Sequence, residues 1–169
     1  MIKTTHWIWI LLVTLFSCTE SKKQFEYFND LGEIPFNKKL DNPNFKVCHE
    51  DITFPFNYGG IGLVYEGEKK ELVSTIQNKF NYPKTKEQNG FITIRFIINC
   101  EGKTGRFRVT EMGFDLKPKK FDKEISKQIL EITKALKGWK AFERNNRTWD
   151  YQQYLVFKLM DGQLKEILP

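Results

Sequence analysis

The stretch from Gly90 to Leu136 limits the possible folds of this chain more than any other. It opens with apolar residues at alternate positions, namely Ile92, Ile94, Phe96, Ile98 and Cys100. A period of two predicts a strand with one face in the core. A turn with two glycines follows at residues 101–105, and a second alternating run continues through Phe107 and Val109. We therefore expect a β-hairpin.

The second part of this stretch carries an apolar stripe at helical spacing. Its members are Phe121, Ile125, Ile129, Ile132 and Leu136. Steps of three and four residues place them on one side of a helix, and lysines and glutamates fill the other sides. Gly138 follows the stripe, where glycine commonly ends a helix. An earlier run at residues 66–80 has the same spacing and predicts a first helix, which Pro83 stops.

Alternation returns near the end of the chain. Residues 149–160 carry Tyr151, Leu155, Phe157 and Leu159 on one phase. This pattern predicts another strand, and residues 163–168 are a candidate for a short further one. Trp139 is expected to close the second helix against the sheet. The elements predict an α+β fold, a small antiparallel sheet of about three strands with two helices packed on one face.

The same residues resemble the C-terminal domain of TonB-type proteins. Asn81-Tyr82-Pro83 followed by Gly90 is similar to the family's entry to its first strand, and Gly138-Trp139-Lys140 is similar to the turn after its last helix. The resemblance covers roughly Gly59 to Gly162. It implies this α+β fold and a domain that binds a partner by strand addition, through a last strand that corresponds to Tyr151 to Lys158.

The first residues have the features of an export signal. Lys3 precedes an apolar run from Trp7 to Phe16, and Ser17-Cys18 follows. At about 1.5 Å per residue the run covers about half of a hydrocarbon core roughly 30 Å thick, which favours a cleaved signal peptide over a membrane span. Its end resembles a bacterial lipobox, and this implies that Cys18 is acylated and becomes the N-terminus. The alternative is an ordinary signal peptide with a chance cysteine.

This interpretation divides the chain into three parts. They are a lipoprotein signal peptide at residues 1–17, a polar tether at residues 18–44 and a TonB C-terminal-like domain at residues 45–169. Acyl chains on Cys18 would hold the protein on a membrane without a spanning helix. Thr19, in place of Asp, favours the outer membrane over the inner membrane. Energy-transducing relatives have an inner-membrane helix instead, so we do not expect energy transduction by this chain alone.

Two cysteines remain after Cys18 is acylated. Cys48 and Cys100 would lie in an exported, oxidising compartment, where an even pair indicates a disulfide. Two buried free thiols are the alternative. A bridge would tie the segment before the domain core to the first strand of the hairpin.

The sequence offers little for catalysis. Gly102-Lys103-Thr104 lacks the earlier glycine of a phosphate-binding loop, because position 97 is Ile. Cys48-His49-Glu50-Asp51 has catalytic residue types, but adjacent residues of an extended chain point to opposite sides. We predict no catalytic residue, metal site or cofactor. The net charge of +6 comes from interleaved basic and acidic residues, a pattern that favours a solvated surface over nucleic-acid binding.

The leading functional hypothesis is a non-enzymatic lipoprotein of the bacterial cell envelope. It would bind an envelope protein or peptide segment and be accessory to TonB-dependent outer-membrane transport. The predicted partner-binding residues are Gln152, Tyr154 and Lys158, on the opposite phase of the last strand from its core residues. A structural lipoprotein with no transport role is the alternative hypothesis, and an enzyme is the least favoured.

Overall fold

The structure is a computed structural model that describes residues 32–81 and 88–169. The signal peptide, Cys18 and Tyr82-Pro83 lie outside the described residues. Glu33–Pro169 forms one compact unit. Residues 33–44, which we expected in the tether, are part of it.

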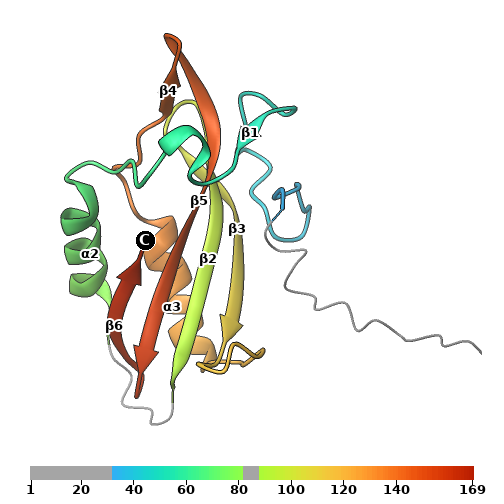
Figure 1. The fold of residues 1–169 in the computed structure, drawn as a ribbon. Helices are drawn as coiled ribbons and strands as arrows, with labels where there is room; N and C mark the ends of the chain where they lie inside the picture. The colour runs from blue at the N-terminus through green and yellow to red at the C-terminus, as the bar shows by residue number, and fades with distance from the viewer. Residues whose placement is uncertain (1–31, 82–87) are drawn as a thin grey trace, which may run out of the picture. The chain divides into compact units, whose positions relative to one another are not determined.

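Within residues 32–81 and 88–169, one sheet and two α-helices make up the fold (Figure 1). The strands are β1 (Thr53–Phe54), β2 (Gly90–Ile98), β3 (Thr104–Met112), β4 (Phe142–Arg144), β5 (Arg147–Met160) and β6 (Gln163–Leu168). The helices are α2 (Glu68–Lys79) and α3 (Lys123–Lys134), with a 3₁₀ turn, η3, at Tyr58–Gly60. The α+β class is confirmed. The expected sheet of about three strands is wrong, because the sheet has six strands and is mixed.

β5 is the central strand. β2 pairs with it antiparallel from Gly90↔Leu159 to Ile98↔Tyr151, and β3 continues the sheet beyond β2. β1 and β6 also pair with β5, in parallel and antiparallel orientation, and β4 forms a hairpin with its first residues. The expectation that Tyr151 to Lys158 offers an exposed edge along its whole length is wrong. β2 pairs with all of it on one side, and on the other side β1 pairs with Tyr151 and β6 with Val156 to Lys158, so that among the described strands only residues 152–155 have no partner on that side.

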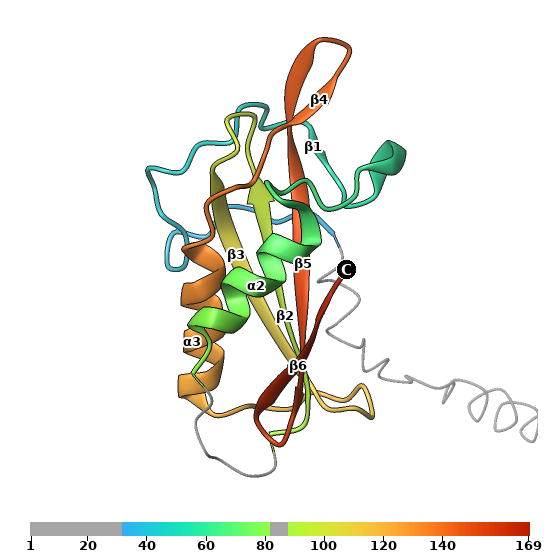
Figure 2. The ribbon, with the colours of Figure 1, turned by 90° about the vertical axis from the view of Figure 1, so that its left-hand side faces the viewer.

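Both helices cover the same face of the sheet (Figure 2). Ile94, Phe96 and Ile129 are fully buried in the core between sheet and helices, and Ile132 is nearly so. Trp139 is also buried and packs against Phe96, with 5.2 Å between ring centroids. The predicted sheet–helix interface is confirmed, since the period-two strand residues meet the period-3.6 helix residues as amphipathic elements require.

The other face of the sheet is partly covered by the segment before β1. We call residues 33–52 the strap. Ile34 and Val47 are buried with Ile97 of β2, and Phe45 packs against this small cluster. Gly105 of β3 makes room for the strap, because a Cβ built there would lie 2.3 Å from the Phe45 ring. The strap closes the second face of the sheet near the ends of β2 and β5.

Candidate partner-binding surface

The three predicted binding residues lie on the face of the sheet away from the helices. Gln152 is 8% exposed, and its Oε1 accepts a hydrogen bond from Nη2 of Arg95 at 3.1 Å. Tyr154 is half-buried, with its ring 4.5 Å from that of Phe56. Lys158 is half-buried, with Nζ 3.8 Å from a carboxylate oxygen of Glu166. Their predicted phase is confirmed, and their role in binding stays a prediction.

Tyr154 and Lys158 belong to a larger surface, which we call the open half-face, whereas Gln152 is buried beside it. This surface combines half-buried residues of three strands: Phe91, Thr93 and Arg95 of β2, Thr110 and Met112 of β3, and Tyr154, Val156 and Lys158 of β5. Phe114, which is 45% exposed, packs edge-on against Phe91 at its border. The surface mixes aromatic and aliphatic groups with two cations, a composition that suits a protein partner.

The outer strands of the sheet are poor templates for a further strand. On β3, the carbonyl of Glu111 accepts a hydrogen bond from the Lys119 N–H, and the carbonyl of Phe107 accepts one from Arg108 Nη1. The pairing of β3 with β2 also shifts in register, between Arg95 and Ile97 of β2. The register of β6 shifts as well, next to Lys158 of β5. Occupied carbonyls and bulges reduce the ability of an edge to pair with another chain. Side chains of the open half-face are better placed for recognition.

The disulfide expected between Cys48 and Cys100 is present in the structure. A buried carboxylate holds both cysteines in place. Oδ2 of Asp150 accepts the backbone N–H of Cys48 at 2.8 Å and of His49 at 2.6 Å, and its Oδ1 accepts that of Cys100 at 2.9 Å. These three backbone N–H groups offset the free-energy cost of burying the Asp150 carboxylate.

Cys48, Cys100 and Asp150 also bring possible metal ligands within 4.8 Å of one another. Both sulfur atoms are bonded to each other, so no thiolate is available to a metal. Sequence reasoning missed Asp150 because it is 50 and 102 residues away from its partners, and no local pattern marks it.

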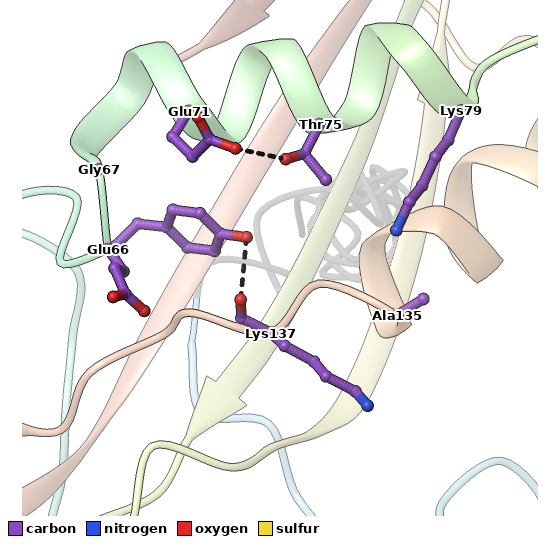
Figure 3. A pocket seen from close by; sticks show the side chains of 8 residues that line it. Glu66, Gly67, Glu71, Thr75, Lys79, Ala135 and Lys137 are labelled. Carbon is purple, nitrogen blue, oxygen red and sulfur yellow. Dashed lines mark hydrogen bonds between the residues drawn. The ribbon is translucent and has the colours of Figure 1, made fainter.

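A groove of about 690 Å³ runs along α2 (Figure 3). Its lining includes Tyr65, whose hydroxyl donates to the carbonyl of Lys137 at 3.3 Å, and Glu71, which accepts from Thr75 Oγ1. Burial, followed by the charges of Glu71 and Glu66, raises the pKa of Tyr65. Tyr65 therefore stays a neutral hydrogen-bond donor at neutral pH. The charged side chains of the groove are exposed, and we assign it no ligand.

Among the described residues, neither helix has the length and apolar composition needed to cross a membrane. Comparison of the chain with protein-family models, with curated proteins and with solved structures finds no match.

Proposed function

We propose that this protein is a lipid-anchored protein of the bacterial cell envelope whose folded unit binds another envelope protein through the open half-face. The single observation that carries the binding proposal is this surface of half-buried aromatic, aliphatic and cationic side chains on β2, β3 and β5. A platform of paired strands presents these side chains in fixed positions, which lowers the entropy lost on binding.

Two further observations support the envelope assignment. Cys48 and Cys100 form a disulfide, and such bonds persist in exported, oxidising compartments. The order of helix, hairpin, helix and long strand is the order that the resemblance to TonB-type domains implies. An accessory role in TonB-dependent transport, and outer-membrane anchoring through acylated Cys18, belong to this proposal. Contact through side chains replaces the strand addition that the resemblance implies, because β2 pairs along one side of β5 while β1 and β6 pair with parts of its other side.

Photo-cross-linking in intact cells tests the proposal. A photoreactive residue in place of Tyr154 should give a discrete cross-linked product with an envelope protein, whereas the same residue in place of Lys127, exposed on α3, should give none. Adding Lys158→Ala should reduce the Tyr154 product with little change in melting temperature, since Lys158 contributes only a long, partly solvated ion pair. Equal products from both positions, or none from Tyr154, would contradict binding at the open half-face.

A further inference from the structure

A cluster of residue types that bind metals lies where the strap meets β5. One ligand atom each from Cys48, Cys100 and Asp150 lies within 4.8 Å of the other two. Cys48 is exposed, Cys100 is half-buried and Asp150 is fully buried. In the oxidised protein the two sulfur atoms are bonded to each other. Opening that bond would leave two thiols and a carboxylate side by side.

The backbone at both cysteines is held in place independently of the disulfide. The Asp150 carboxylate accepts the backbone N–H of Cys48 at 2.8 Å and that of Cys100 at 2.9 Å. Asn99 donates from Nδ2 to the carbonyl of Lys46 at 2.9 Å, which joins the residues that precede the two cysteines. The apolar cluster of the strap adds further contacts. These interactions keep the two thiols close together after reduction, so little entropy is lost when both bind one ion.

The chemistry of the cluster suits a zinc ion. Two thiolates beside the Asp150 carboxylate would place three negative charges within 4.8 Å of one another, and a divalent cation removes this repulsion. Two sulfur ligands combined with oxygen or nitrogen ligands are a set that zinc takes in proteins. Nδ1 of His49 is buried without a hydrogen bond to the described residues, 3.4 Å from Oδ2 of Asp150, and this nitrogen is in reach of a fourth position.

We propose that reduction of the disulfide creates a zinc site, in which the thiolates of Cys48 and Cys100 and the carboxylate of Asp150 bind the ion. The reductant is an external dithiol, which reaches the bond at exposed Cys48. It becomes a disulfide itself, and the two cysteines take up its two electrons and two protons as thiols. Zinc binding then releases the two protons to water. The inference goes beyond the proposed function and does not depend on the open half-face.

Zinc retention after reduction tests the proposal. The full mature chain with Cys18→Ser has only Cys48 and Cys100 as thiols, and it is reduced with a phosphine, which contains no thiol. After addition of zinc and gel filtration, the reduced chain should keep one zinc ion and the oxidised chain none. Zinc should raise the melting temperature of the reduced chain alone. Cobalt in place of zinc should give the charge-transfer absorption of sulfur ligands. Absence of retained zinc from the folded, reduced chain would overturn the proposal.

Asp150→Asn separates a built site from an ordinary pair of thiols. It should lower the zinc affinity of the reduced chain at least about tenfold. The control is Asp51→Asn, which removes the same charge from an exposed position near Cys48 and should bind zinc like the parent. An equal affinity in both variants would overturn the role of Asp150. If Asp150→Asn does not fold, carbon-13 NMR of the reduced parent decides, because zinc should shift the side-chain carboxyl resonance of Asp150. An unshifted resonance would contradict the site.

Discussion

Single polar residues with several partners fix the strap on the sheet. Asp150 joins the backbone of both cysteines, and Asp41 of the strap joins Arg108 of β3 through two bonds of 2.7 and 2.8 Å. The phase of Gln152, Tyr154 and Lys158 was predictable from alternation within one strand. Arg95, which donates to Gln152, was not, because it lies 57 residues away and the register of β2 against β5 is needed to place it.

The Asp41 ion pair predicts a dependence of stability on pH. The hydrogen bond from Arg108 is the largest effect and lowers the pKa of Asp41 below its ordinary value, against the opposing effect of burial. A lowered folded-state pKa stabilises the protein above the unfolded pKa of about 3.9, and this stabilisation is lost as pH falls through the folded value. Asp41→Asn should cost about 1–3 kcal/mol at pH 7.

Urea unfolding at pH 7 and at pH 3 measures this contribution. The difference between the wild type and Asp41→Asn should shrink at the lower pH, because pH 3 lies below the unfolded-state pKa of about 3.9 and the unfolded chain then binds a proton at this carboxyl. An unchanged difference would show that Asp41 acts through packing instead of charge. Asp115→Asn is a suitable control, since Asp115 is exposed and its Lys117 partner is 3.8 Å away.

At the scale of elements, length decided what the sequence could predict. β2, β5, α2 and α3 each contain enough residues for a period of two or 3.6 to be visible, and all four were predicted close to their observed bounds. β1 and β4 have two and three residues, too few to show a period. β1 pairs with residues of β5 that are distant in sequence, and β4 pairs with β5 across the Asn145–Asn146 turn. The six-stranded sheet was therefore missed.

The two faces of β2 and β5 should respond differently to truncation. Phe96 is fully buried under the helices, and Phe96→Ala should cost about 3–5 kcal/mol through lost burial and a cavity. Gln152 is buried on the other face but contributes one hydrogen bond, so Gln152→Ala should cost about 1 kcal/mol. Urea unfolding of both variants checks this, and equal losses would mean that the second face is packed as tightly as the core.

At the scale of the molecule, the sheet is enclosed on one face by α2 and α3 and on part of the other by the strap. The strap is attached by a covalent bond, by the ion pair of Asp41 and by the apolar contacts of Ile34, Phe45 and Val47. The disulfide was foreseen from the sequence, because cysteine counting needs no coordinates. Of the noncovalent contacts, those of Ile34 and Asp41 come from residues 33–44, whose polar, aperiodic composition predicted a tether.

This attachment predicts that the disulfide and the strap contacts can be separated experimentally. The bond spans 52 residues, and its loss should destabilise the protein by about 4 kcal/mol, mainly because the unfolded chain gains freedom. The folded state of Cys48→Ser with Cys100→Ser should still hold the strap through Asp41 and the apolar cluster. Gly105→Val should instead release the strap, because the valine side chain would occupy the space of the Phe45 ring while the disulfide stays intact.

Hydrogen exchange of the strap amides distinguishes these two effects. In the double serine variant the amides near Phe45 should keep their protection under conditions where the protein is still folded, although urea unfolds it at a lower concentration. In Gly105→Val the same amides should lose protection, and the core amides of β2 should keep theirs. If removing the disulfide alone exposed the strap amides, the covalent bond would be the main attachment and the Asp41 and apolar contacts would be too weak to hold the strap without it.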